Sequence, residues 1–309
     1  MNKTYVKLTE SLPIEFELAT LILSIIAIII NAITMILIHG KSSMISSNMA
    51  ITCSCCCAAI CFAMLRAADS ILPILAFSKL NWFLRRCVFD NITLVSFESV
   101  YNIHIAILSL EKFHLLLYPF KHQRIATKAN ITKLLLVVWF IPGVSLFFMV
   151  KIAAHTYCRC CLEWFSVPIL KTVMQYGIIP IVFFIPPFIT VLFYAVILCK
   201  LHQTLNPESY ASCRHSQYQR HKISFKNKKA FIQASITITM YILTFMPMLI
   251  IIYIINRSNS HLFIIPFCMS NMMISLFLCL HPITIICFNA SLKSEARRRL
   301  LQYFQCCQT

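Results

Sequence analysis

The sequence predicts an all-α integral membrane protein, a bundle of seven transmembrane helices followed by an amphipathic helix on the membrane surface. Composition is the first reason: 59% of the 309 residues are hydrophobic and 12% are charged, about half the charged share of a soluble domain. The second is that the chain divides into long apolar segments, and about 20 such residues form a helix that crosses a bilayer. The third is an excess of basic residues in one set of loops.

Polar loops separate these segments and give the domain organisation. A membrane domain, 17–288, is expected between an N-terminal tail, 1–16, and a C-terminal helix and tail, 289–309. In the C-terminal helix, apolar residues spaced by four form one face and basic residues lie off it, which is typical of a helix on a membrane surface. The expected spans are 17–39, 45–75, 87–120, 133–150, 172–199, 230–255 and 262–288.

The basic residues predict the orientation of the chain. With the N-terminus outside, 17 of the 27 Lys and Arg residues fall on the cytoplasmic side, as the positive-inside rule requires. We therefore expect a plasma membrane protein with an extracellular N-terminus, where Asn2 begins a glycosylation sequon, and a cytoplasmic C-terminus. Contact with anionic membrane lipids then explains the formal net charge of +17 without a nucleic-acid partner.

Four polar residues inside the second and third spans are candidates for a site. Glu98 is the first, because an acid within a membrane is costly unless it is paired or faces water. Asn102 follows one turn later on the same face, and Arg66 and Asp69, three residues apart, are expected to neutralise each other in part. Two interpretations stay open: a polar pocket for a small ligand with a cationic or hydrogen-bonding group, or an internal Glu98–Arg66 or Glu98–Asn102 pair.

The cysteines divide into three groups. A run of five, Cys53 to Cys61, lies in an apolar segment, where a thiol behaves as a small buried hydrophobe. Cys158, Cys160 and Cys161 lie in a loop with no second ligand cluster at matching spacing, which disfavours a metal site. Cys306 and Cys307 adjoin the surface helix and suit palmitoylation.

No motif indicates an enzyme or a bound cofactor. The chain has no His-Glu-x-x-His sequence and no paired intramembrane acids at helical spacing. A transporter stays an alternative, although the chain has only three glycines and no visible inverted repeat, whereas discontinuous transport helices usually need such breaks.

Single residues in several spans follow a characteristic order. They are Asn31, Cys87, Glu111-Lys112-Phe113 with Tyr118-Pro119, Trp139, Pro186 with Tyr194, Tyr241 to Pro247, and His281-Pro282. This ordered set, over about residues 20–305, resembles the rhodopsin-like (class A) G-protein-coupled receptors. The resemblance implies a receptor for an extracellular small ligand that signals through a heterotrimeric G protein.

The resemblance also implies roles for individual residues. The implied disulfide joins Cys87 to one of Cys158, Cys160 and Cys161. Leu94, where amine receptors of this family place an aspartate, argues against a biogenic amine. The implied ligand pocket contains Glu98, Asn102, Arg66, Asp69, Leu94 and Phe245. The implied switch toward the G protein contains Glu111, Lys112, Phe113, Tyr194, Pro247, His281 and Pro282.

Several positions depart from the family pattern. Lys112 replaces an arginine and lacks its planar fork of donors. Ala58 stands at the usual aspartate position of the second helix, Phe245 replaces a tryptophan, and His281 replaces an asparagine. Such divergence is typical of chemosensory groups such as fish odorant or nematode serpentine receptors, and it keeps open a seven-helix receptor that does not couple to G protein.

Overall fold

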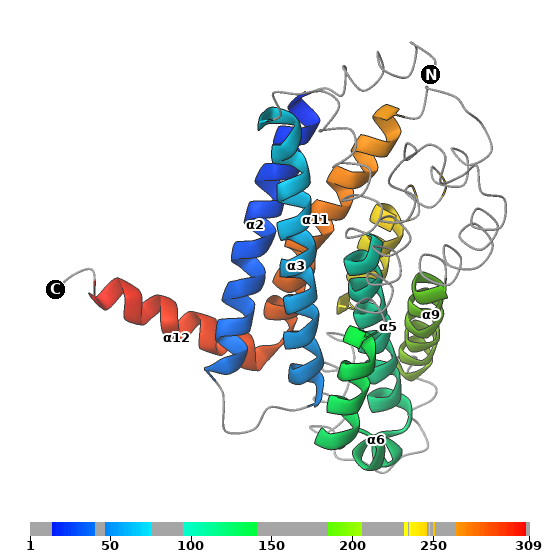
Figure 1. Cartoon of the computed structure of the whole chain (residues 1–309). Coiled ribbons are helices and arrows are strands. Elements are labelled where there is room, and N and C mark those ends of the chain that lie inside the picture. The colour runs from blue at the N-terminus through cyan, green and yellow to red at the C-terminus, as the bar shows by residue number, and fades with distance from the viewer. Residues whose placement is uncertain are drawn as a thin grey trace.

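The computed structural model describes residues 14–40, 47–75, 95–140, 185–205, most of 232–250, and 264–306, and every regular element within them is helical. Figure 1 shows their arrangement. Residues 128–140 and 235–245 are helical in addition to the labelled helices. The labelled helices are α2 (Ile14–His39), α3 (Ser47–Leu75), α5 (Val95–Leu117), α6 (Pro119–Ile125), α9 (Ile185–Leu205), α11 (Ile264–Phe288) and α12 (Ala290–Cys306).

Three helical segments are long and apolar enough to cross a membrane: Glu15–His39, Ser47–Ile71 and Met269–Phe288. Ile185–Lys200 and Ser235–Phe245 are shorter apolar helices. The outward face of α2 is lined by isoleucines such as Ile29 and Ile36, whose side chains are 53% and 54% exposed. A stripe of this kind suits contact with lipid. The all-helical fold and its membrane-spanning character therefore agree with the sequence prediction.

Several helix ends differ from the expected ones. Helix α2 begins at Ile14, within the expected tail 1–16, and carries Glu15 and Glu17 in its first turn, where acids interact favourably with the helix dipole. Helix α9 continues to Leu205, beyond the expected end at 199. The short helix α6 was not expected; it begins with Pro119 at a position that suits proline. Hydropathy marks apolar stretches, whereas helices extend into polar flanks.

Helix α3 packs against α2 and α5, α2 against α11, and α5 against α9. Small residues allow the close approach of α2 and α3: Ala27, Ala59 and Ala63 are fully or almost fully buried in one core cluster. Large aromatic residues, including Tyr101 and Phe277, fill the same cluster toward α5 and α11. The bundle is thus organised around α3 and α5, the helices that carry the predicted polar site.

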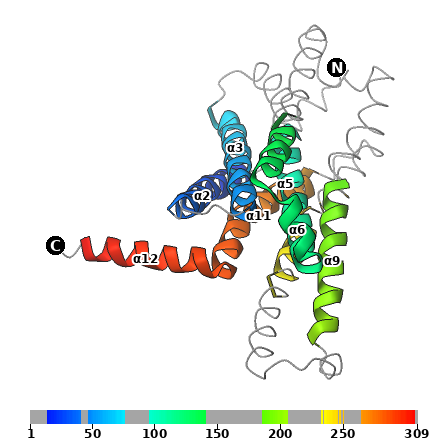
Figure 2. The ribbon, with the colours of Figure 1, turned by 90° about the horizontal axis from the view of Figure 1, so that it is seen from below.

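Helix α12 extends sideways from the bundle (Figure 2) and contacts α11 and α2. Leu292 packs with Leu37 and Ile38 at the end of α2. Glu295 accepts hydrogen bonds from Arg298 Nη2 at 2.7 Å and Arg299 Nε at 2.9 Å, and these bonds hold the pKa of its carboxyl below the usual value. We call this end of the bundle, where α2 ends and α3 begins, the α12 end.

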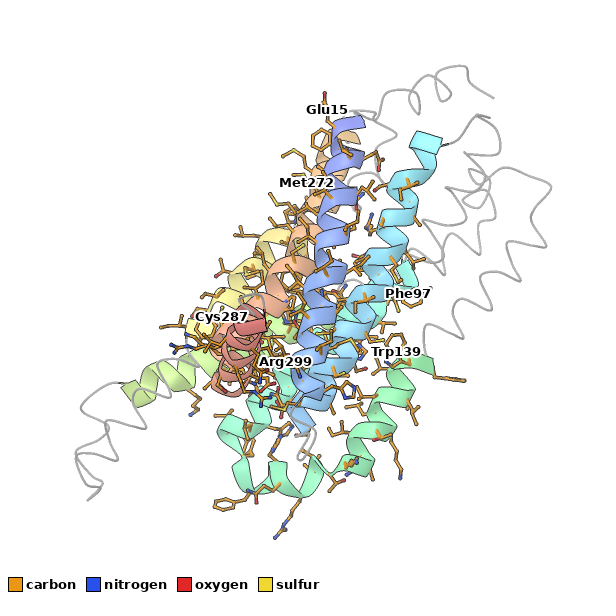
Figure 3. The ribbon with its side chains drawn as sticks, turned by 90° about the vertical axis from the view of Figure 1, so that its left-hand side faces the viewer. Glu15, Phe97, Trp139, Met272, Cys287 and Arg299 are labelled. Carbon is orange, nitrogen blue, oxygen red and sulfur yellow. The ribbon has the colours of Figure 1, made fainter. Side chains whose placement is uncertain are left out.

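Glycine at position 40 makes room for this packing. A Cβ atom added to Gly40 would meet the guanidinium of Arg299. Figure 3 labels Arg299 near the end of α2 that lies opposite Glu15. The sequence prediction of a helix after residue 289 is confirmed, and its attachment to α2 is a feature of the tertiary structure.

Candidate functional site

Four of the predicted pocket residues are buried side chains of α3 and α5, and we call them the polar cluster: Arg66, Asp69, Glu98 and Asn102. Their exposed fractions are 5%, 6%, 2% and 0%. Glu98 and Asn102 lie one turn apart on α5, so they share a face of that helix. The close packing of α3 on α5 buries the cluster. The structure therefore buries four of the six predicted pocket residues on two helices that pack together.

The polar cluster is incompletely hydrogen-bonded. Tyr241 Oη donates to Asn102 Oδ1 at 3.2 Å. Four other buried atoms have no hydrogen-bond partner among the described residues: Arg66 Nε, Asp69 Oδ1, Glu98 Oε1 and Asn102 Nδ2. Leaving a buried polar atom without a partner costs about 1–3 kcal/mol. These four atoms are therefore unsatisfied within the described part of the chain.

The internal pairs considered from the sequence make no direct contact among the described residues, although the charge of Arg66 acts on the Glu98 carboxyl. Within the part of the chain that the structure describes, no ion pair joins Arg66 to Asp69 or Glu98. The Glu98–Asn102 hydrogen bond is absent too, because Asn102 Oδ1 accepts from Tyr241 while Asn102 Nδ2 has no partner in the described part. The guanidinium of Arg66 instead lies over the ring of Phe62, 5.4 Å from its centroid.

An aromatic layer lies next to the polar cluster, and it consists of Tyr101, Tyr241, Phe245, Phe277 and His281. The Tyr241 and Phe245 rings are 4.6 Å apart, and His281 stacks on Phe277 at 5.4 Å and 18°. Tyr101 Oη lies 3.3 Å from His281 Nδ1. The predicted residues Phe245 and His281 therefore meet in one layer, and the Tyr241–Asn102 hydrogen bond joins this layer to the polar cluster.

At the α12 end of α5, the carboxylate of Glu111 is surrounded by partners. It accepts hydrogen bonds from Asn48 Nδ2 at 2.6 Å and from Ser47 Oγ at 3.5 Å. His122 Nε2, carried by α6, lies 3.3 Å from Glu111 Oε1. Glu111 therefore ties the start of α3 to α5 and lies close to α6, where His122 Nε2 makes no hydrogen bond with the described residues.

Lys112 and Phe113 point to a different neighbour. Lys112 Nζ donates to Tyr194 Oη at 3.4 Å and lies 5.7 Å from the centroid of that ring. Phe113 packs against Phe193 at 4.9 Å. Because consecutive helical residues are rotated by about 100°, Glu111 faces α3 whereas Lys112 faces α9. The structure thus brings together Lys112 and Tyr194, two residues of the predicted switch.

Pro282 lies inside α11, next to His281, and it explains the partner of Asn31. Proline has no N–H, so the carbonyl four residues earlier, that of Leu278, loses its helical donor. Asn31 Nδ2 donates to this carbonyl at 3.0 Å and to Ala27 O at 2.8 Å. Asn31 therefore satisfies on α11 the acceptor that Pro282 leaves free. Pro247, by contrast, lies on an exposed part of its helix.

A hydrogen-bonded chain that sequence reasoning missed connects three helices. Trp139 Nε1 donates to Ser54 Oγ at 2.9 Å, and Ser54 Oγ lies 2.8 Å from His104 Nε2. His104 Nδ1 lies 2.7 Å from Val100 O. Because a carbonyl only accepts, Nδ1 carries the proton and Nε2 accepts from Ser54. Trp139, labelled in Figure 3, is thereby fixed against α3. In the sequence, the one signal for this hydrogen-bonded chain was a histidine inside an apolar segment.

The remaining predicted site residues are not part of this geometry. Asn2, Cys87, Leu94, Cys158, Cys160, Cys161 and Cys307 lie outside the described residues, and Cys306 is the last residue of α12. The cysteines of the α3 run are unbonded thiols. In the described ranges, no three His, Cys, Asp or Glu side chains come close enough to hold a metal ion.

Comparisons with known proteins add no relative. No family model matches this chain. No curated protein matches it either. The case for a function therefore depends on the residue pattern and on the contacts described above.

Proposed function

We propose that this protein is a divergent rhodopsin-like G-protein-coupled receptor with seven membrane spans in the plasma membrane. The α12 end faces the cytoplasm, and the N-terminus is extracellular. An extracellular small ligand, such as a chemosensory cue, binds at the polar cluster. The signal passes to a heterotrimeric G protein at the α12 end.

The observation that carries this proposal is the distribution of polar groups along α5. Its first turn contains Glu98, a buried carboxylate with an unpartnered oxygen, and its last turns contain Glu111 and Lys112, which contact α3 and α9. The aromatic layer lies between them. One helix therefore links a group that lacks partners to a group that ties helices together, as a receptor with an input and an output requires.

The proposed route of the signal follows the contacts in order. A ligand that engages Asn102 changes its hydrogen bond with Tyr241, and this bond joins α5 to the helical residues 235–245. Movement there repacks Phe245 against Phe277, which stacks on His281. Pro282 gives α11 a place to bend. Repacking at this level alters the Lys112–Tyr194 contact and opens the surface for the G protein.

Membrane lipids are the second class of partner at the α12 end. Lys121, Arg124, Lys128 and Arg297 are exposed there, and each basic residue near an anionic leaflet contributes about 1 kcal/mol of attraction. Palmitoylation of Cys306 and Cys307 adds acyl chains to the same surface.

Nucleotide exchange on G proteins tests the proposal. Membranes containing the full chain are screened with odorant, peptide and lipid panels, and a responding ligand is repeated on Lys112→Ala. We expect this change to abolish the response, because the Tyr194 contact and the positive charge are both lost. Lys133→Ala, which removes an exposed lysine of the same face, is the matched control. Ligand-driven nucleotide exchange that is unchanged by Lys112→Ala would refute the assigned switch.

A second candidate is a seven-helix receptor that does not couple to G protein, and two residues favour it. Lys112 has one donor group where the family has a fork of donors, and His281 is packed into the aromatic layer. Ligand binding without exchange on any G protein would select this alternative. Uptake of a labelled solute without exchange would instead indicate a transporter.

A further inference from the structure

A groove of about 570 Å³ lies between α2, α3 and the helical residues 128–140. We call it the α3 groove, because residues of α3 line it from Ser47 to Cys57. Its volume falls within the range of about 300–1,000 Å³ that is usual for small-molecule sites. Trp139, labelled in Figure 3, is one of its lining residues. None of the residues of the polar cluster lines it, so it is a separate site.

The sequence of α3 explains why the groove is hollow. Four of its lining residues are small: Ala50, Cys53, Ser54 and Cys57. Their spacing of three and four residues places them on one face of the helix. Small side chains on this face leave space that larger ones would fill. Two cysteines of the α3 run therefore shape a groove, and they do so as free thiols.

The groove has a polar end and an apolar end. Lys128 and His39 line its polar end, and both are exposed. Met35, Leu135 and Trp139 are half-buried and continue the groove away from that end. The 11 residue steps from Lys128 to Trp139 correspond to about 16 Å along the helix axis. This is about half of the 30 Å hydrocarbon thickness of a bilayer, so the groove has the depth of one leaflet.

The charge at the polar end is positive. Lys128 lines it, and of the described residues that line the groove none is acidic. The neighbouring acid, Glu111, accepts a hydrogen bond from Ser47 but is 7% exposed and does not line the groove. The polar end therefore suits an anionic group, whereas the remaining length suits a hydrocarbon chain.

Trp139 suits contact with a hydrocarbon chain because its one polar atom is already bonded. Its Nε1 donates to Ser54 Oγ at 2.9 Å, and Ser54 Oγ lies 2.8 Å from His104 Nε2. Neither the indole N–H nor the serine hydroxyl needs a partner from the groove. The ring of Trp139 is left to make apolar contacts there.

We propose that the α3 groove binds one anionic phospholipid of the cytoplasmic leaflet. The head group lies at Lys128 and His39, and one acyl chain passes Met35 and Leu135 to reach Trp139. A free anion would gain nothing from the apolar walls, and a neutral lipid would gain nothing from the charge of Lys128. The inference goes beyond the proposed function. It shares with that function only the cytoplasmic position of the α12 end, where anionic lipids are concentrated.

Fluorescence quenching of Trp139 tests the inference. The chain has three tryptophans, and Trp82→Phe with Trp164→Phe leaves Trp139 as the one reporter. This protein is reconstituted in phosphatidylcholine vesicles with increasing fractions of brominated phosphatidylserine or brominated phosphatidylcholine, whose bromine atoms quench indole on contact. Phosphatidylserine should quench at a mole fraction at least about fivefold lower, the factor that one basic residue near an anionic head group supplies. Native mass spectrometry of the unmodified chain gives a second measure of this preference.

A charge variant locates the head group. Lys128→Gln should lower the preference for phosphatidylserine by about fivefold. Lys133→Gln removes the same charge from an exposed residue of the same helix that does not line the groove, and it should retain the preference. An equal loss in both variants would show diffuse attraction to the basic surface and would overturn the inference.

A shape variant locates the acyl chain. Cys57→Phe fills the groove and should abolish the preference, whereas Cys287→Phe places the same side chain at an exposed cysteine outside the groove and should retain it. If Cys57→Phe folds poorly, the smaller change Cys53→Leu serves the same purpose. Retained preference in both groove variants would contradict the proposed position of the chain.

Two further outcomes would overturn the inference. Equal quenching by the two lipids would show that the groove does not select an anionic head group. No quenching of Trp139 by either lipid would show that another segment or a second copy of the chain covers the groove. Unbrominated phosphatidylserine should relieve the quenching more effectively than a sterol at the same mole fraction, and the reverse would identify a sterol site. No G protein takes part, so failure here leaves the proposed signalling standing, and failure of nucleotide exchange leaves this inference standing.

Discussion

Helix α5 carries two buried glutamates that differ in their hydrogen-bond partners. Glu111 is 7% exposed and has three neighbours, Asn48, Ser47 and His122. Glu98 is 2% exposed, and one of its oxygens has no partner in the described part of the chain. The comparison teaches that burial alone does not give an acid its role. The Glu111 carboxylate holds helices together, whereas the Glu98 carboxylate has an oxygen without a partner among the described residues.

Removing the Glu111 side chain tests the difference between the two glutamates most directly. Glu111→Ala leaves Asn48 Nδ2 and Ser47 Oγ without their acceptor, so we expect a loss of about 3 kcal/mol in the free energy of unfolding. Glu98→Gln should leave this free energy unchanged or raise it, because it removes an unsatisfied charge. Unfolding of the detergent-solubilised protein measures both, and Glu15→Ala should change it by less than about 0.5 kcal/mol. A larger loss from Glu98→Gln than from Glu111→Ala would reverse our assignment.

Replacing Asn31 tests a second buried polar group that has hydrogen-bond partners. Asn31→Leu leaves the Leu278 carbonyl without a donor, with an expected loss of about 2 kcal/mol in the free energy of unfolding. Pro282→Ala restores a backbone N–H that can reach this carbonyl. In the Pro282→Ala background, Asn31→Leu should therefore lower the free energy of unfolding by a smaller amount. Equal losses in the two backgrounds would show that Asn31 does not act through the proline.

Replacing Ser54 tests the hydrogen-bonded chain of Trp139, Ser54 and His104, which contains no ion pair. Ser54→Ala removes the acceptor of Trp139 Nε1 and the donor to His104, and we expect a loss of about 1.5 kcal/mol. Thr132→Ala, which removes an exposed hydroxyl bonded within its own helix, is the control. Tryptophan fluorescence during unfolding reports both variants, and a loss no larger than that of Thr132→Ala would remove the chain from the list of stabilising contacts.

The smallest expected effect is the dependence of the stability of α12 on pH. Hydrogen bonds from Arg298 and Arg299 lower the pKa of Glu295 in the folded protein. Their contribution is therefore complete above the unfolded value of about 4.3 and is lost as the pH falls through the folded pKa. Hydrogen exchange of the 290–306 segment, corrected for intrinsic rates, should show less protection at low pH. Glu295→Gln should flatten this dependence, and an unchanged profile would contradict the assignment.

Much of the fold could be predicted because hydropathy is local. The apolar runs at 17–39, 45–75 and 262–288 correspond to three helices long enough to cross a membrane. The count of seven spans, the orientation and the disulfide of Cys87 stay predictions. The helix ends were less predictable, as Ile14 and Leu205 show, because backbone hydrogen bonds carry a helix past its apolar stretch into polar residues.

The candidate site could be predicted only as a set of residue types. Glu98 was found because an acid in an apolar segment is costly wherever it points. His122 and Ser54 were missed because their partners, Glu111 and Trp139, are distant in sequence or on another helix. A single sequence carries no signal for such contacts, since many polar side chains could satisfy the same group.

By itself, the sequence determined that this protein is helical, apolar enough for a membrane, and furnished with acids and bases inside its apolar segments, because these properties belong to residues and their neighbours along the chain. The tertiary structure decided which of those groups are satisfied. Packing α3 against α5 gave Glu111 its partners and left the polar cluster with unpartnered atoms, since hydrogen bonds depend on distances of about 3 Å between helices. Two acids on one helix therefore differ in their partners for a reason that no single residue of the sequence contains.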